Sequence, residues 1–214
     1  MSRLLVERAS DSAHPPRARR IGWWAVTVTS LLVGAYALGM AASNFAFLPV
    51  EVAANRFPTG VLLKIHIVAS GLALVTGPFQ FVRRLRRRRP AAHRALGRTY
   101  VFACLLGGLA GGTIALFSAS GLVAGLGFFL LAIAWLYCTI RAWRAALAHD
   151  YMQHQRWMIR SFSLTFGAVM LRVYIPLALT MGFTFAQAYP VIAWLAWVPN
   201  LFLAQRLVRS PARI

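Results

Sequence analysis

Acidic residues are almost absent from this 214-residue sequence. It holds four Asp and Glu against 23 Lys and Arg, and all charged residues together make up only 13% of the chain. A soluble domain has about 25% charged and about 45–50% apolar residues, whereas 59% of this chain is hydrophobic. The shortage of charge excludes a soluble globular enzyme and a disordered chain, and it indicates a membrane protein.

Long uncharged runs are what the sequence has instead, and each is long enough to cross a bilayer as a helix. The period-two alternation of a barrel strand is absent. We therefore expect an all-α, polytopic integral membrane bundle of about six transmembrane helices. The expected division is a basic tail at 1–20, a six-helix domain at 21–205 and a basic tail at 206–214, with spans at about 21–43, 60–82, 99–119, 121–143, 157–180 and 189–205.

The net charge of +19 is unevenly distributed. Twenty of the 23 basic residues fall in the two tails and in the second-to-third and fourth-to-fifth connections, which six spans place on one side. The positive-inside rule predicts that this side, with both termini, is cytoplasmic. The charge thus reports topology and excludes nucleic acid as a partner. The first run, Ile21–Ser43, is too long for a signal-peptide core, which favours a retained helix over a cleaved one.

Cysteine is also scarce. The two cysteines, Cys104 and Cys138, form no CxxC motif and are expected in the cytoplasmic halves of their helices. Reducing conditions on that side disfavour a structural disulfide. The third span is rich in glycine at GxxxG spacing, which predicts close helix packing or room for a flat ligand. These glycines are Gly107, Gly108, Gly111 and Gly112.

Two histidines begin inward-facing stripes on their helices. Pro90 can start the third helix, and the small or polar residues that follow His93 at helical steps include Gly97, Tyr100 and Cys104. On the fifth helix, a similar stripe runs from His154 down to Arg172, five turns away. Both histidines are therefore expected at the cytoplasmic mouth of the bundle, facing one another.

Facing imidazoles at equal depth are what an axially bis-histidine haem needs. The sequence thus suggests haem b binding and membrane electron transfer, with quinone or another membrane redox protein as partner. His93 and His154 would ligate the iron and Gly97 would accommodate the ring. The expected propionate-binding residues are Arg94, Arg98, Arg156 and Arg160. Simple interfacial hydrogen bonding by the two histidines is the alternative interpretation.

Two further classes of function stay open. An interfacial metal-dependent membrane enzyme would combine His93 and His154 with His149 and Asp150 around zinc or iron. A transporter or sensor of a small anionic ligand would use a second group of polar residues in the outer half of the bundle. This group comprises His66, Arg172, Lys64 and Ser70. Glu51 is the other partner that the sequence offers Arg172, as a salt bridge.

Three motifs together resemble a bacterial family of predicted membrane proteins. The first is Gly77-Pro78-Phe79-Gln80-Phe81, preceded by His66 and Ser70-Gly71. The second is His93-Arg94-x2-Gly97-Arg98-x-Tyr100, and the third is His154-x-Arg156-Trp157-Met158-Ile159-Arg160-Ser161-Phe162. The family is the domain of unknown function twenty-three-oh-six, and the similarity runs from about Gly60 to Pro176. The resemblance implies a polytopic inner-membrane protein. Relatives often carry Arg directly after the last histidine, where this chain has Gln155.

Overall fold

A computed structural model describes residues 17–43, 59–118 and 120–209, and in these ranges all regular structure is helical. Six segments in this part are long and apolar enough to span a membrane, which confirms the expected all-α, six-span class. The elements are α2 (Arg17–Ala42), α4 (Thr59–Thr76), η1 (Pro78–Phe81), α5 (Arg83–Arg88), α6 (Pro90–Leu116), α7 (Leu122–Leu147), α8 (Tyr151–Thr165), α9 (Gly167–Thr180), α10 (Phe185–Leu195) and α11 (Val198–Arg209).

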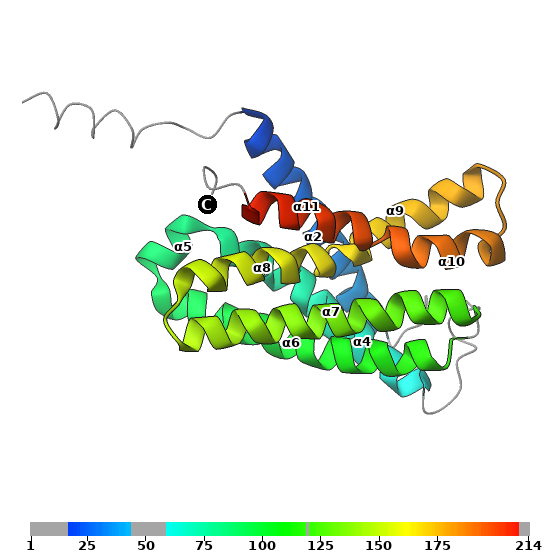
Figure 1. The fold of residues 1–214 in the computed structure, drawn as a ribbon, viewed down its shortest axis with the longest axis horizontal. Helices are drawn as coiled ribbons and strands as arrows, with labels where there is room; N and C mark the ends of the chain where they lie inside the picture. The colour runs from blue at the N-terminus through cyan, green and yellow to red at the C-terminus, as the bar shows by residue number, and fades with distance from the viewer. Residues whose placement is uncertain (1–16, 44–58, 119, 210–214) are drawn as a thin grey trace, which may run out of the picture.

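Neighbours in sequence are neighbours in space. α2 packs on α4, α4 on α6, α6 on α7 and α7 on α8, and these four are the most extensive helix contacts. Figure 1 shows α6, α7 and α8 lying side by side, while α9 and α10 form a hairpin at the far end from α5. α10 also packs on α7, and α11 on α8. Short connections of alternating direction therefore build the bundle.

Several helices extend beyond the uncharged runs that predict them. α6 begins at Pro90, which stands in its first turn and confirms that this proline starts the third helix. α7 continues to Leu147, and α8 starts at Tyr151, where the side chain of Asp150 accepts a hydrogen bond from the Gln153 amide. These charged helical turns project the basic residues past the apolar core.

The last two spans are each built from two helices. The fifth runs through α8 and α9, and its helix is interrupted at Phe166, between Thr165 and Gly167. The sixth breaks between Leu195 and Val198. Pro199 lies in the first turn of α11, because proline fits a helix start and disrupts a continuous helix before it. Pro199, the proline within this apolar run, predicts a break in the span, and the observed break falls just ahead of it.

The outer surface of the bundle is apolar, as lipid exposure requires. Leu32, Leu106 and Leu116 each expose more than half of their surface. The interior is lined by small residues, and Ala73, Ala124 and Ala142 are completely buried. Without a hydrophobic driving force between helices in lipid, such small residues let the helices approach closely.

The arginine-rich α5 lies at one end of the bundle, together with the starts of α6 and α8; we call this the basic end. The start of α2 and the end of α11 also point towards this end (Figure 1). The described part of the chain thus places all of these positively charged segments together, as an even number of spans requires.

The positive-inside rule predicts that the basic end faces the cytoplasm. A reporter enzyme that is active only in the periplasm should therefore be inactive when fused after Arg209. The same reporter fused after Gly182, in the turn between α9 and α10, should be active. Activity after Arg209 together with inactivity after Gly182 would show that the bundle has the opposite orientation in the membrane.

Candidate functional site

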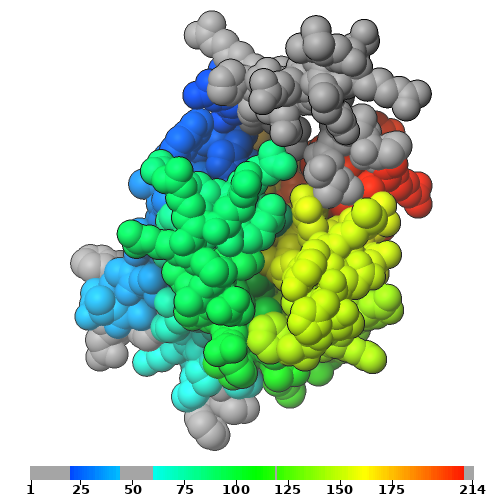
Figure 2. All heavy atoms as spheres, turned by 90° about the vertical axis from the view of Figure 1, so that its left-hand side faces the viewer, coloured from blue at the N-terminus to red at the C-terminus, as the bar shows by residue number. Residues whose placement is uncertain are grey.

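The three sequence motifs meet at the basic end of the bundle. Residues 77–81 form η1 and the turn before it, residues 93–100 form the start of α6, and residues 154–162 form the start of α8. Figure 2 looks onto this end: the α5–α6 segment and α8 stand beside one another with a seam between them. Chain segments about 15 and 50 residues apart therefore contribute to one site.

Aromatic packing holds η1 against α8. A Cβ added to Gly77 would lie 2.5 Å from the ring of Phe162, so only glycine leaves room for that ring. Phe162 in turn packs against Phe81, with ring centroids 5.5 Å apart, and Phe81 contacts Trp23 of α2 at 5.8 Å. These edge-on and tilted ring contacts fix the position of η1 relative to α8 and α2.

Gln80 of η1 reaches towards α6. Its Oε1 lies 3.1 Å from the position that a Cβ would occupy on Gly97, so the amide covers the glycine face. Only 7% of the Gln80 surface is exposed, and its Nε2 is buried without a hydrogen-bond partner among the described residues. A buried amide donor with no partner is costly and calls for a ligand or water at the site.

His93 of α6 and His154 of α8 lie close enough for their charges to interact. The Nδ1–H of His154 donates to the Ala142 carbonyl of α7 at 2.9 Å, which leaves its Nε2 as the nitrogen with a free lone pair. The Nδ1 of His93 is buried and has no partner in the described part of the chain. The charges of Arg86 and Arg94 also act on His93.

A buried polar network lies below the two histidines and ties three helices together. The Tyr100 hydroxyl is 2.9 Å from both the Ser161 and the Thr165 hydroxyls of α8. From α7, Thr139 bonds Ser161 at 2.7 Å and the Trp135 indole N–H donates to Thr165 at 2.9 Å. In a dry interior such a network fixes the register of the helices.

Removing the Tyr100 hydroxyl should measure the strength of this network. Tyr100→Phe is expected to lower the free energy of unfolding by about 1–2 kcal/mol, because Ser161 and Thr165 each lose a buried partner. Thermal unfolding in detergent checks this. Tyr137→Phe is the matched control. This tyrosine is 51% exposed, and removal of its hydroxyl should change the free energy of unfolding by no more than about 0.5 kcal/mol. Equal effects of both variants would contradict the role of the network.

The four arginines expected to bind propionates lie in different surroundings. Arg94 is exposed beside His93, whereas Arg98 lines a groove on the opposite flank of α6. Arg160 stacks on Trp157 and donates to Gln205 of α11 at 2.8 and 2.9 Å. Arg156 is half-buried, and its Nε has no partner among the described residues.

His66 belongs to a separate cluster deeper in the bundle. Its Nδ1–H donates to the Gly107 carbonyl at 2.8 Å, and its Nε2 lies 3.5 Å from the Ser70 hydroxyl. A Cβ on Gly111 would lie 2.7 Å from the imidazole. Gly111 of α6 therefore makes room for a flat ring, and that ring is the His66 side chain.

Arg172 interacts with His66, whereas Lys64 lies on another side of the helix that carries His66. The charge of Arg172 acts on His66, and its guanidinium donates to the Ala168 carbonyl of its own helix at 2.9 Å. Lys64 lines the groove between α4 and α6, about 200° around the helix from His66. Glu51, the expected salt-bridge partner of Arg172, lies outside the described residues.

Metal ligands do not cluster in the described part of the chain. No group of three or more His, Cys, Asp or Glu side chains is placed to hold a metal ion there. His149 and Asp150 are exposed at the connection between α7 and α8, and Asp150 caps α8. Cys104 and Cys138 are buried free thiols. The zinc or iron site expected from His93, His149, Asp150 and His154 is therefore not assembled by these residues.

The pattern of the family described as predicted membrane protein (DUF2306) matches residues 63–208. The chain belongs to this family. The DUF2306 match runs from α4 to α11, so it contains all three motif segments. It also contains α7, which hydrogen-bonds His154 and Ser161 of the third motif. No curated protein and no solved structure matches the chain.

Some residues of the DUF2306 site have no role assigned from sequence alone. Gln80 is a polar residue in an apolar stretch, and this contrast is the feature of the sequence that could have indicated a functional role. Trp135 and Thr139 lie in the long apolar run of α7, where a single hydroxyl or indole does not stand out. Arg86 was hidden among the neighbouring arginines of α5.

Proposed function

We propose that this DUF2306 protein binds one haem b at the basic end, with His93 and His154 as axial ligands, and works in membrane electron transfer. One imidazole from α6 and one from α8 is the donor set of a bis-histidine haem. The observation that carries the proposal is the pair of buried nitrogens without partners, His93 Nδ1 and Gln80 Nε2, beside a second histidine whose Nε2 is free for a ligand.

The surrounding chain suits the two ligands. The hydrogen bond from His154 Nδ1 to the Ala142 carbonyl orients the ring and raises the basicity of Nε2, as partners of metal-bound histidines do. The polar network from Tyr100 to Ser161 holds α6 and α8 in fixed register two turns below. Two rigid helices would thus present their imidazoles without rearrangement.

The propionates would bind to a set of residues that only partly overlaps the set that the sequence suggests. Arg86 and Arg94 are the cations whose charges act on His93, and Gln80 offers a buried N–H donor. These three lie on the η1, α5 and α6 side of the seam, while Arg98 and Arg160 are engaged elsewhere. Positive groups near a carboxylate stabilise it and hold the group at the interface.

When bound, haem supplies a one-electron carrier whose potential depends on its axial ligands. One such centre at one face of the membrane serves exchange with a quinone or with another membrane redox protein, and the bacterial inner membrane is the setting we propose. His93 and His154 would hold the iron through one nitrogen each, and the packed rings of Phe81 and Phe162 hold η1 and α8 in place near this site.

The test is a titration of ferric haem into the purified protein in detergent, followed by absorption spectroscopy. We expect saturation at one haem per chain with the spectrum of a six-coordinate, low-spin iron. Protein-free micelles provide the baseline for non-specific uptake. Uptake that rises without saturation, as in the micelles, would contradict the proposal.

A further inference from the structure

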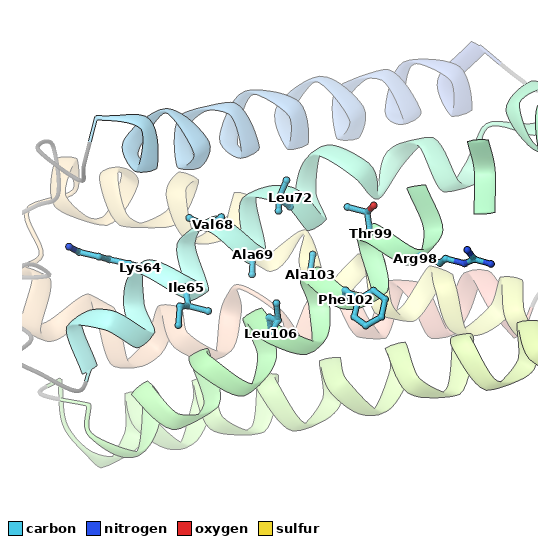
Figure 3. Close-up of a pocket in the computed structure, with 10 residues that line it drawn as sticks. All are labelled: Lys64, Ile65, Val68, Ala69, Leu72, Arg98, Thr99, Phe102, Ala103 and Leu106. Atoms are coloured by element: carbon cyan, nitrogen blue, oxygen red, sulfur yellow. The ribbon is translucent and has the colours of Figure 1, made fainter. Parts of the chain in front are cut away.

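A groove of about 640 Å³ runs along the outside of the bundle between α4 and α6. Ala69 and Ala103 are buried and form its floor, and Leu72, Phe102 and Leu106 line its walls. Figure 3 shows these side chains between the two helices, with Arg98 at one end of the groove and Lys64 at the other. The groove lies on the opposite flank of α6 from His93 and does not depend on the haem proposal.

The groove opens towards the lipid. Phe102 is 63% exposed and Leu106 is 55% exposed, although both lie within the membrane-spanning length of α6. The groove is apolar along its length, because the one hydroxyl in it, that of Thr99, donates to the Ala95 carbonyl of its own helix. From Lys64 to Leu72 the helix rises about 12 Å over eight residue steps, enough for much of an acyl chain to lie alongside.

Arg98 marks the level of the lipid headgroups. It is the last charged residue before the chain runs uncharged from Thr99 to Ile140, so it stands where the apolar span begins. Its side chain is exposed at the groove end nearer the basic end of the bundle. A planar guanidinium binds phosphate oxygens through two parallel hydrogen bonds. Its positive charge also favours a headgroup with net negative charge over a neutral one.

The neighbouring charges favour the same occupant. The helix α5, which packs on the start of α6, contributes a row of exposed arginines at this end. Juxtamembrane clusters of this kind attract anionic lipids. A quinone headgroup would instead need hydrogen-bond donors for its carbonyl groups at mid-length. Between Lys64 and Arg98 at its two ends the groove is lined by apolar side chains and by Thr99, whose hydroxyl already donates to the Ala95 carbonyl.

We propose that the groove between α4 and α6 holds one anionic phospholipid, with an acyl chain over Ala69 and Ala103 and the phosphate on Arg98. The site is on the face of the membrane at which the basic end lies. The apolar walls of the groove accommodate the acyl chain, and the guanidinium of Arg98 selects for headgroups with net negative charge.

The experiment uses the full chain in mild detergent, exchanged into a mixture of phosphatidylglycerol and phosphatidylcholine and analysed by native mass spectrometry. We expect one phosphatidylglycerol retained per chain in preference to phosphatidylcholine. Arg98→Gln should reduce that preference at least tenfold, while Arg144→Gln, a control at an exposed arginine of the same end, should leave it unchanged. Leu106→Trp, which fills the groove from its exposed wall, should release the lipid.

A phosphatidylglycerol with a photoreactive acyl chain locates the site independently of any variant. Crosslinked peptides should map to 65–72 and 102–106, on both sides of the groove. Labelling spread evenly over the exposed helices, equal retention of the two lipids, or recovery of a quinone in place of the phospholipid would each overturn the proposal. An unchanged preference in Arg98→Gln would do the same.

Discussion

His93→Ala and His154→Ala should each abolish the six-coordinate haem spectrum that we expect for the unchanged protein. An axial nitrogen is lost in either case, so the iron becomes five-coordinate or haem no longer binds. His154→Ala also removes the hydrogen bond to the Ala142 carbonyl, which is worth about 1 kcal/mol of stability. The measurement is a haem titration of each variant, with thermal unfolding to show that the fold is retained.

His149→Ala is the matched control for both. This histidine is exposed at the same end of the bundle, with its ring against Tyr151 at 6.1 Å, and it has no place in the proposed ligand set. Its variant should bind haem as the unchanged protein does. Should either ligand variant keep the low-spin spectrum, shared ligation fails, and His93 and His154 are then interfacial hydrogen-bonding groups.

Gly77→Ala is expected to lower the free energy of unfolding by about 1–3 kcal/mol, although it adds a single methyl group. The backbone of Gly77 is right-handed helical and suits alanine, so the cost comes from crowding: the added methyl would lie 2.5 Å from the Phe162 ring and 2.9 Å from the Ala73 carbonyl oxygen. The Phe162 ring is 6% exposed and packed against Phe81, and it has little space to retreat. Overpacking of this kind would move η1 away from α8.

Two further variants separate this contact from helix propensity. Gly39→Ala lies in α2 with nothing within 4 Å of the added methyl, so it should be neutral or slightly stabilising. In the double variant Gly77→Ala with Phe162→Leu, the smaller side chain leaves room for the methyl, and the two losses should combine to less than their sum. Full additivity in thermal unfolding would contradict the packing of η1 on α8.

The class of the fold follows from sequence because lipid imposes it. Uncharged runs of about 20 residues have few structures open to them in a bilayer, and Pro90 can start a helix through its fixed φ. The breaks at Phe166 and ahead of Pro199 are less predictable. A helix break inside an apolar run depends on which neighbouring helix covers it, and hydropathy carries no record of that.

The candidate site is only partly readable from sequence. Helical periodicity puts His93 and Tyr100 on one face of α6, and the structure places both towards α8. The same periodicity does not say which helix lies opposite. The contact between the His66 ring and Gly111 is therefore seen only in the structure. Sequence proximity to a histidine also misplaces Arg98, which points to the lipid-facing flank because it is about 140° around the helix from His93.

The central claim, a haem held by His93 and His154, is tested most directly by the visible absorption spectrum of the protein purified in detergent from haem-replete cells. The account predicts a Soret band, and after reduction it predicts sharp α and β bands from a bis-histidine iron. A colourless preparation that keeps its fold would contradict it.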